Sequence, residues 1–409
     1  MPNKRLLIIS FIFPPQLLAR SLQLLKTANA LAKLGWDITV YTADFSLLKY
    51  KCDEGLLDKL DPSIKLIPGY TFENWLLANM TASLSLGMPD DKYLWRYRGK
   101  KYLKEFLKTE KFDAMASFGL QWSSHLLAEE VKKFSNLPWL AHFSDPWVEN
   151  DYHHRVWPIS AVNRAQERSV ATLADRLCFT TEKTEELVLK KYSPEIQKKG
   201  MSVPHCFAPE LYPEAEPFEE GLHLVHVGSF YGKHNPVNFL KAVKAFLEKQ
   251  PRFKKILKCH FVGLGQGKYA SLSEELGIGE NLEFIPKVPY FESLGWMKRA
   301  TALFSIDVVK NSLLSKLPDY VGAGRPLFAI SDEGSPTWTY VEKLHGLTAR
   351  QSDVADISEK LERLALSWEK DGALAEFRYS EEEASFFDSL NTTAILSGAL
   401  EELAQKQNG

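Results

Sequence analysis

NSLLSKLPDYVGAGRPLFAI, residues 311–330, has the pattern of a helix followed by a strand. The apolar, β-rich run TALFSIDVV at 301–309 precedes it and predicts a strand, so the whole is a strand–helix–strand unit. Ser315 is the expected N-cap of the helix, and Gly322 lies near its expected end. Pro318 falls in the first turn, where its missing N–H is no loss.

The start of this predicted helix is a candidate anion site. A helix N-terminus presents free backbone N–H groups and a partial positive charge, and Lys316 adds a full charge there. Asp319, three residues later, falls on the same face, so an ammonium and a carboxylate could meet one ligand. A diphosphate would suit the cation, and the hydroxyl groups of a sugar would suit the carboxylate. An ordinary surface ion pair followed by a glycine cap has the same pattern, and this stretch alone does not distinguish the two readings.

Length and composition bound the class of protein. A chain of 409 residues is too long for one hydrophobic core, so two domains are expected. Hydrophobic content of 45% and charged content of 25% are ordinary for a globular protein. The net charge of −2 gives no general affinity for nucleic acid, and we predict no nucleic-acid partner.

Cysteine usage and hydropathy indicate a cytoplasmic protein. The four cysteines are scattered, without zinc-site or disulfide-framework spacing. The basic and apolar N-terminus stops at Pro14-Pro15 without a cleavage site, so it predicts a strand rather than a signal peptide. No run approaches the roughly 20 apolar residues that span a bilayer, and an integral membrane protein is not expected.

The first residues predict a βαβ unit. Leu6–Phe13 has the continuous apolar character of a buried parallel strand, Ser21–Leu34 has helical spacing, and Asp37–Thr42 is a second strand. The loop Pro14–Arg20 then lies at the carboxyl end of a strand, where open α/β sheets bind ligands. Arg20 is the candidate ligand contact there, or else an exposed helix residue.

The segment 92–108 is the most basic part of the chain. It holds seven Lys or Arg residues against one Glu, interleaved with aromatic residues. A helix of this kind suits an anionic bilayer surface or a phosphate-bearing acceptor. The alternative is a solvated helix with its aromatic side chains in the core.

A loop rich in proton-transfer groups follows the predicted strand Pro138–Phe143. Asp145 lies just past the strand end, and His142 and Glu149 are near it in sequence. Asp145 could instead only open the Asp-Pro turn.

A second βα array follows the Pro/Glu-rich segment 209–221, which we predict to be a linker. Its first strand, Leu222–Val227, leads into Gly228-Ser229. Glycines after strands are common for steric reasons, and GLGQG at 263–267 lacks the spacing of a dinucleotide fingerprint.

Several stretches, in order and spacing, resemble one known family over nearly the whole chain. They are IISFIFPP with LAR, LAKLGWDITVYT, MPDDKYLW, FDAMASFGLQWSSHLLA, LPWLAHFSDPW, LADRLCFTTEKTEELV, HVGSFYGKHNP, VPYFESLGWMKRATALFSID and SKLPDYVGAGRPL. Together they resemble the GT-B glycosyltransferases of the family-four type, which are retaining and depend on nucleotide sugars.

The resemblance implies an α/β protein of GT-B architecture, with two Rossmann-like domains facing a central cleft. Residues 1–208 would bind the acceptor and residues 222–384 the nucleotide sugar, joined by the linker 209–221. A C-terminal helix, about 385–409, would pack back on the first domain.

The resemblance also implies roles for individual residues. The phosphate-binding basic pair falls on Lys233 and Lys316, and the carboxylate for the donor sugar or ribose falls on Asp319. Asp145 would orient the acceptor hydroxyl, with His142 as the alternative. Further donor contacts are expected at Gly228, Ser229, His234, Lys287, Val288 and Ser315, and acceptor contacts at Arg20, Trp95, Gln121, Ser123 and Trp147.

The chain departs from the family pattern at several positions. Leu17-Leu18 replaces a Gly-Gly pair, Ser229 stands where an Arg is usual, and Asn311 replaces a Glu. The missing cation could be supplied by His234. A non-catalytic partner in a glycan-assembly complex, a nucleotide-sugar epimerase and a two-domain small-ligand binding protein therefore remain alternatives.

The activity that these features predict is transfer of a sugar from a nucleotide sugar to a glycan or lipid-linked acceptor, in cell-surface polysaccharide or glycoconjugate synthesis. The chain has no Asp-x-Asp motif, so we expect retention without a metal or other cofactor. The protein would be cytoplasmic, with the 92–108 helix docking on the inner face of a membrane.

Overall fold

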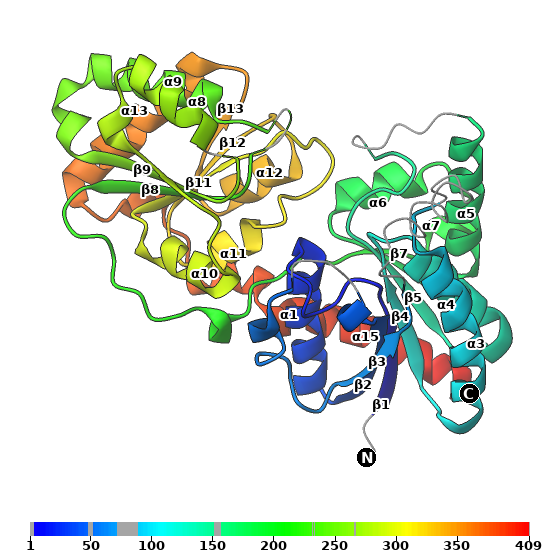
Figure 1. The fold of residues 1–409 in the computed structure, drawn as a ribbon. Coiled ribbons are helices and arrows are strands. Elements are labelled where there is room, and N and C mark those ends of the chain that lie inside the picture. Colours follow the sequence, from blue (N-terminus) through cyan, green and yellow to red (C-terminus); the bar gives the residue numbers. More distant parts are fainter. Residues whose placement is uncertain are drawn as a thin grey trace. The chain divides into compact units, whose positions relative to one another are not determined.

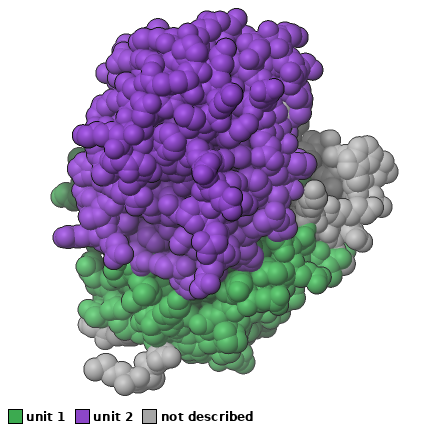
Figure 2. All heavy atoms as spheres, turned by 90° about the vertical axis from the view of Figure 1, so that its left-hand side faces the viewer, with its two compact units in different colours: residues 1–206, 389–409 green, residues 207–388 purple. Residues whose placement is uncertain are grey.

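The chain forms two parallel β-sheets, each belonging to its own unit. The computed structural model describes residues 4–47, 52–71, 89–150, 157–230, 232, 234–265 and 267–408. Unit 1 comprises residues 1–206 and 389–409, and unit 2 comprises residues 207–388 (Figure 2). The α/β class expected from the sequence is confirmed.

Unit 1 is built on a seven-stranded sheet of order β3-β2-β1-β4-β5-β6-β7 (Figure 1). All its neighbouring strands are parallel. The strands are β1 (Lys4–Ile9), β2 (Trp36–Ala43), β3 (Lys65–Gly69), β4 (Ala114–Phe118), β5 (Trp139–Phe143), β6 (Arg176–Phe179) and β7 (Gly200–Ser202). The helices are α1 (Ala19–Lys33), η1 (Phe45–Leu47), η2 (Glu54–Leu56), α3 (Tyr93–Thr109), α4 (Ser123–Ser135), α5 (Ile159–Leu173), α6 (Glu182–Leu189), α7 (Pro194–Gln197) and α15 (Ser389–Asn408).

Both faces of this sheet are buried, which explains why its strands are apolar without alternation. Leu6 and Ile8 of β1 pack on one face with residues of α1 and α15. Leu7 and Ile9 pack on the other face with residues of α3, α4 and α5. The C-terminal helix α15 lies against α1, and the Trp36 indole N–H donates to Ser397 Oγ at 2.9 Å.

Unit 2 is built on a six-stranded parallel sheet of order β10-β9-β8-β11-β12-β13. Its strands are β8 (Leu222–Val227), β9 (Leu257–Val262), β10 (Leu282–Ile285), β11 (Ala302–Ile306), β12 (Leu327–Ser331) and β13 (Leu347–Arg350). Its α-helices are α8 (Val237–Lys249), α9 (Ala270–Glu275), α10 (Tyr290–Arg299), α11 (Leu317–Gly322), α12 (Pro336–Lys343), α13 (Val354–Asp371) and α14 (Glu381–Ala384). Short 3₁₀ turns are η3 (Pro209–Leu211), η4 (Pro251–Lys255), η5 (Gly267–Tyr269), η6 (Gly279–Asn281), η7 (Ala375–Phe377) and η8 (Ser385–Phe387).

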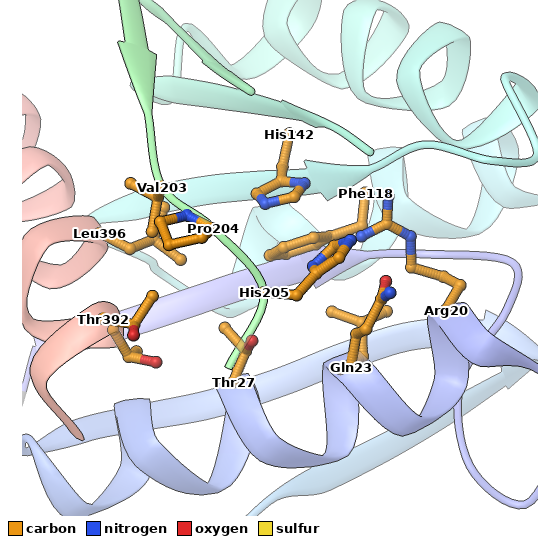
Figure 3. A pocket seen from close by; sticks show the side chains of 12 residues that line it. Arg20, Gln23, Thr27, Phe118, His142, Val203, Pro204, His205, Thr392 and Leu396 are labelled. Atoms are coloured by element: carbon orange, nitrogen blue, oxygen red, sulfur yellow. The ribbon is translucent and has the colours of Figure 1, made fainter. Parts of the chain in front are cut away.

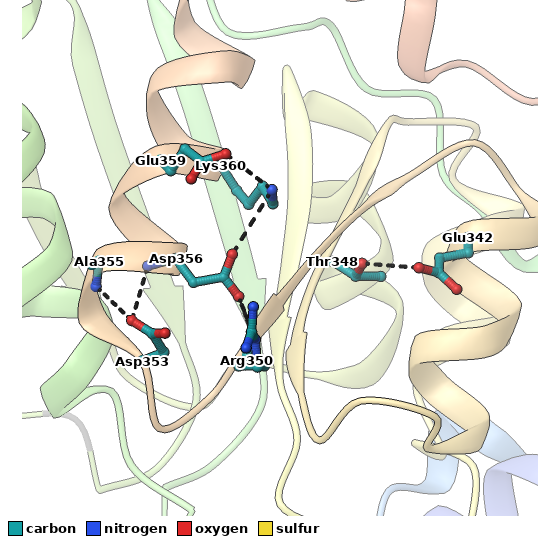
Figure 4. A network of polar contacts seen from close by, with 8 residues as sticks. All are labelled: Glu342, Thr348, Arg350, Asp353, Ala355, Asp356, Glu359 and Lys360. Atoms are coloured by element: carbon teal, nitrogen blue, oxygen red, sulfur yellow. Dashed lines mark hydrogen bonds and ion pairs between the residues drawn. The ribbon is translucent and has the colours of Figure 1, made fainter.

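The longest helix of unit 2, α13, begins at a well-formed cap (Figure 4). Asp353 Oδ1 accepts hydrogen bonds from the backbone N–H groups of Ala355 and Asp356, at 3.0 and 3.1 Å. Asp356 in turn accepts the N–H of Arg350 at 2.8 Å. These bonds satisfy N–H groups that a helix start leaves unpaired and join β13 to α13, which packs beside α8 on one face of the sheet.

None of the helices in the described ranges is both long enough and apolar enough to cross a membrane.

Candidate functional site

In unit 1, the candidate residues gather at the carboxyl edge of the sheet. Arg20 lies in the first turn of α1, His142 is in β5, and Asp145 follows β5. The strands β1, β4 and β5 are neighbours, so their carboxyl ends are adjacent. Ligands of open parallel sheets bind at this edge.

Arg20 is buried, with 3% of its surface exposed. Among the described residues, its Nε and Nη2 atoms have no hydrogen-bond partner. Burial lowers the pKa of Arg20 to about 10, while the charge of Asp145 acts to raise it. The guanidinium therefore remains charged at neutral pH although it has left bulk water.

Three buried histidines accompany Arg20. Burial, followed by the charge of Arg20, lowers the pKa of His125 to about 3 and holds the pKa values of His142 and His205 well below the usual range. The rings of His142 and His205 stack with centroids 6.1 Å apart, and His205 Nε2 lies 3.4 Å from Ser144 Oγ. All three imidazoles are therefore neutral at neutral pH.

A small cavity lies between these groups and α15. Its volume is about 20 Å³, and Arg20, His142, His205, Phe118 and Thr392 are part of its lining. Figure 3 shows the Arg20 side chain reaching from α1 toward the rings of Phe118 and His205. A space of this size holds about one water molecule or one ligand oxygen.

Two tryptophans predicted to contact the acceptor are packing residues in this structure. Trp95 is 1% exposed and donates its indole N–H to Thr42 O at 3.1 Å. Trp147 is 4% exposed, stacks on Trp122 at 4.9 Å and donates to Asn163 Oδ1 at 2.7 Å. Neither offers a ring face to a ligand, so their placement gives the acceptor assignment no support.

Ser123 and Gln121, the other predicted acceptor contacts, lie at the start of α4. Ser123 is fully buried, and both its N–H and its hydroxyl donate to the carboxylate of Asp90, at 2.8 and 2.6 Å. Burial raises the pKa of Asp90, and the bonds from Ser123 oppose that effect. Ser123 thus holds a buried carboxylate, whereas Gln121 is half-buried before α4.

In unit 2, Ser229 and His234 follow β8, while Lys316 precedes α11. His234 Nδ1 lies 3.0 Å from Ser229 O, and its Nε2 contacts Ile306 O at the end of β11. The His234 ring is thereby placed between the first loop and the end of β11. Ser229 Oγ accepts the N–H of Leu264 at 3.2 Å, which ties the first loop to the second.

Buried His226 shows that the cations of unit 2 lie close together. Its burial, then His234 and more weakly Lys316, lower its pKa to about 3. His226 Nδ1 lies 3.2 Å from Phe304 O, and its Nε2 has no partner within the described part of the chain. His234 and Lys316 therefore place positive charge around one point at the ends of β8 and β11.

Lys316 and Asp319 meet at Tyr290. The Lys316 ammonium lies 5.9 Å from the centre of the Tyr290 ring, and the Tyr290 hydroxyl donates to Asp319 Oδ1 at 3.1 Å. Asp319 is 4% exposed, whereas Lys316 is half-buried. The expectation that Ser315 caps α11 is wrong, because Lys316 occupies the N-cap position and no side chain caps the helix.

The remaining predicted donor residues lie at the same edge or outside the described residues. Gly228 directly follows β8, while Lys287 and Val288 follow β10, which lies two strands away from β8. Lys233 lies outside the described residues. No group of three or more His, Cys, Asp or Glu side chains in the described ranges could hold a metal ion.

Sequence reasoning missed four residues that shape these edges: His125, His205, His226 and Tyr290. His125, His226 and Tyr290 lie within the stretches that carry the resemblance, but the resemblance assigned them no role. His205 lies outside these stretches, and all four join the sites only through folding. The one available signal was that Gly119 and Gly228 each follow a strand. A Cβ at these positions would lie 2.6 Å from His125 Nε2 and 2.9 Å from His226 Nε2, respectively.

The sequence matches no protein-family model, and no curated protein is significantly similar to it. Solved structures with a similar fold include HepE from Anabaena in complex with UDP-glucose, with a TM-score of 0.67 and 11% identity over 98% of this chain and 100% of that one. Sucrose-phosphate synthase from Thermosynechococcus elongatus has a TM-score of 0.65 at 13% identity, over 98% of this chain and 99% of that one. The lipopolysaccharide outer core galactosyltransferase WaaB has a TM-score of 0.61 at 14% identity, over 97% and 99%.

These likenesses extend over both units, as the sequence resemblance implied. Each unit contributes a parallel sheet with a candidate site at its carboxyl edge. The chain therefore has the GT-B fold.

Proposed function

We propose that the protein is a glycosyltransferase that moves a sugar from a nucleotide sugar to a glycan or lipid-linked acceptor. The observation that carries the proposal is the carboxyl edge of unit 2, where His234 and Lys316 surround His226 and Asp319 lies beside them at Tyr290. The similar HepE binds UDP and UDP-glucose, and WaaB is a galactosyltransferase by name.

The chemistry needs stabilisation of the departing diphosphate. Charge develops on this leaving group as the bond from the sugar breaks, and fixed cations at that point lower the barrier. In this proposal Lys316, Lys233 and His234 bind the diphosphate, and Asp319 holds the sugar or ribose. No metal is required, and the configuration at the sugar carbon is retained.

Asp145 orients the acceptor hydroxyl in unit 1, with His142 as the alternative. Asp145 is half-buried just past β5, and its charge acts on Arg20. His142 is neutral, so it can accept a proton, but its lowered pKa makes it a weak base. This difference favours Asp145.

The test is a thermal-shift screen of the full chain against UDP, GDP, CDP, dTDP and ADP and their common sugars, with and without EDTA. A ligand that binds only the folded state raises the melting temperature once its concentration exceeds its dissociation constant. We expect one nucleotide to stabilise the protein equally in EDTA and its sugar to be transferred. A strict need for a divalent cation would reject metal independence, and silence across the panel would reject the donor site.

A non-catalytic GT-B binding partner is the second candidate. The observation in its favour is that Ser229, which stands where the family has a cation, is neutral and bonded to the next loop. Such a protein would bind a nucleotide or a partner in the same screen yet turn over no donor in a coupled assay for released nucleotide.

Helix α3 supports docking on an anionic membrane surface. Tyr93, Tyr97 and Tyr102 are 45%, 51% and 46% exposed, although Trp95 lies in the core. Exposed Lys101 and Lys104 lie on the same helix. Tyrosines of this kind suit the headgroup region, and each nearby cation contributes about 1 kcal/mol at an anionic surface.

Cosedimentation with anionic vesicles, lost at high salt, is the expected result for this helix, and the variant Lys101→Glu/Lys104→Glu should bind more weakly. A matched control is Lys241→Glu/Lys244→Glu, which changes the same charge on α8 of unit 2. Equal binding to neutral vesicles would show that the surface is not electrostatic.

A further inference from the structure

We infer that Arg20 holds a negatively charged oxygen group of the acceptor, a phosphate or a carboxylate, at the carboxyl edge of the sheet in unit 1. The inference rests on the proposed function, and it deepens it by naming the chemical class of the acceptor. In the sequence, a phosphate-bearing acceptor is one interpretation of the basic segment 92–108, and no pattern indicates one at Arg20. The argument comes from the burial of Arg20 and from what surrounds it.

The first step is the state of the guanidinium. Arg20 is 3% exposed, and two of its nitrogen atoms, Nε and Nη2, lack a hydrogen-bond partner in the described part of the chain. Leaving charged N–H groups buried without acceptors is strongly unfavourable, and proteins pair such groups or place them where a ligand supplies the acceptor. Asp145 supplies opposite charge but not these two bonds.

The second step is that the surroundings offer hydrogen-bond donors, and that Lys26 of α1 adds positive charge near His205. His142 Nδ1 is buried and has no hydrogen-bond partner among the described residues. The imidazoles of His142 and His205 are neutral, so each can donate one N–H to an oxyanion. Arg20 also lies in the first turn of α1, a 15-residue helix whose N-cap, Leu18, makes no side-chain cap bond, so the helix dipole favours an anion.

The third step is size. The cavity beside Arg20, His142 and His205 measures about 20 Å³, enough for one oxygen but not for a sugar ring. The bound group therefore places one oxygen in the cavity, while the sugar ring that carries it stays outside the cavity. A sugar phosphate and a hexuronic acid both have this form, because each carries its oxyanion on a short substituent that extends from the ring.

An anion bound at Arg20 would also act on the neighbouring rings. Burial is the largest cause of the lowered pKa values of His142 and His205, and the charge of Arg20 is the next. The other groups that act are His125 of α4 on His142, and Lys26 of α1 and His142 on His205. An anion at Arg20 would offset the charge of Arg20 but not the burial, so it would act to raise these two pKa values.

The experiment is calorimetric titration of the full chain with α-glucose 1-phosphate, glucuronate and glucose. We expect at least tenfold tighter binding of one or both anions than of glucose. Binding of α-glucose 1-phosphate would identify the recognised group as a phosphate, and binding of glucuronate would identify it as a carboxylate. Equal or undetectable binding of all three at millimolar concentration overturns the inference.

The variants Arg20→Met and Arg20→Gln should each weaken anion binding at least tenfold, while stabilisation by the nucleotide identified in the donor screen stays unchanged. Arg20→Met should also raise the melting temperature, because it removes a buried charge whose bonds are unmade. The matched control is Arg5→Gln at the opposite end of β1, where Arg5 pairs with Glu110 at 2.6 Å. It should leave anion binding unchanged.

Two results separate this inference from the proposed function. If Arg20→Met and Arg20→Gln keep wild-type anion affinity, the Arg20 site is wrong even when donor binding and transfer hold. If no nucleotide stabilises the chain but the anions bind and require Arg20, the site survives and the donor assignment fails. A fall in the melting temperature of Arg20→Met with unchanged anion binding assigns Arg20 a purely structural role and overturns the inference.

Discussion

The carboxyl edges of the two sheets hold their cations differently. In unit 1, Arg20 is 3% exposed and surrounded by neutral histidines. In unit 2, His234 and Lys316 are half-buried around a single neutral histidine, His226. A buried cation can bind only a group that has lost its water, whereas half-buried cations can exchange a hydrated diphosphate. The carboxyl edges of two similar sheets can therefore favour selective ligand binding in one unit and ligand turnover in the other.

The two edges also share a packing device. A glycine follows a strand in each unit and lies against a buried histidine ring, Gly119 against His125 and Gly228 against His226. The ring nitrogen that faces the glycine has no hydrogen-bond partner among the described residues in either case. Both rings are neutral, and we therefore expect acid to destabilise both sheet edges.

Acidification should produce the largest effect. Four wholly buried histidines have pKa values lowered by burial: His125, His142, His205 and His226. The unfolded chain binds protons at these sites below pH ~6.5 and the folded chain does not, so stability present above that pH is lost as the pH falls. Each site contributes up to about 1.4 kcal/mol per pH unit. Urea unfolding at pH 7.5 and 5.5 should therefore differ by several kcal/mol.

The loss of stability in acid should be larger in unit 1 than in unit 2, because three of the four histidines lie in unit 1. Hydrogen exchange resolved by segment should show unit 1 opening first at pH 5.5. His142→Phe should reduce the pH dependence of the stability. Equal stability at the two pH values would mean that these histidines are not buried as described.

Loss of a cation from unit 2 should have the next largest effect. If Lys316 binds the diphosphate as proposed, Lys316→Ala should remove a charge-assisted contact worth about 1.5–3 kcal/mol, which corresponds to roughly 10- to 100-fold weaker nucleotide binding. Calorimetry with the nucleotide from the donor screen measures the loss, and kcat/KM should fall at least as much. The matched control is Lys310→Ala, an exposed lysine on the same loop that pairs with Asp332 at 3.6 Å. Unaltered nucleotide affinity in Lys316→Ala would remove Lys316 from the donor site.

Substitution of the two strand-end glycines should have a smaller effect on stability, and the effect should differ between them. Gly119→Ala would place a Cβ 2.6 Å from His125 Nε2 and 2.7 Å from the Trp122 ring, while Gly228→Ala would meet only the His226 ring, at 2.9 Å. Overpacking of this kind destabilises by about 1–3 kcal/mol. Gly119→Ala should therefore be the more destabilised variant in urea unfolding.

Gly398→Ala is the control for this pair. A Cβ at Gly398 meets nothing within 4 Å, and alanine favours the helix α15 by up to about 1 kcal/mol. The comparison fails if Gly119→Ala and Gly228→Ala are as stable as Gly398→Ala, since the strand ends would then tolerate side chains.

Regular elements were the most predictable part of the fold. The predicted strand at 222–227 agrees with β8 to the residue, and the predicted helix at 92–108 differs from α3 by one residue at each end. Continuous apolar runs identified strands buried on two faces, and period 3.6 identified the helices that cover them. Ser315 failed as a cap because the loop before α11 continues one residue further than its sequence suggests.

The site was predictable only in outline. Arg20, Asp145, Lys316 and Asp319 were each placed at a strand end or a helix start. Whether a side chain there faces a ligand depends on what covers it, and the sequence does not show this for Trp147, which stacks on Trp122 and bonds Asn163.

The sequence by itself determined the α/β class, the two arrays of strands and the strand ends where charged residues collect, because hydrophobic period and chain polarity are local properties. The tertiary structure decided which of those charges leave water. Arg20, His142, His205 and Thr392 come from four segments far apart in the sequence, yet they line one cavity. Desolvation depends on every atom packed around a group, and that packing exists only once the sheet, α1 and α15 have assembled.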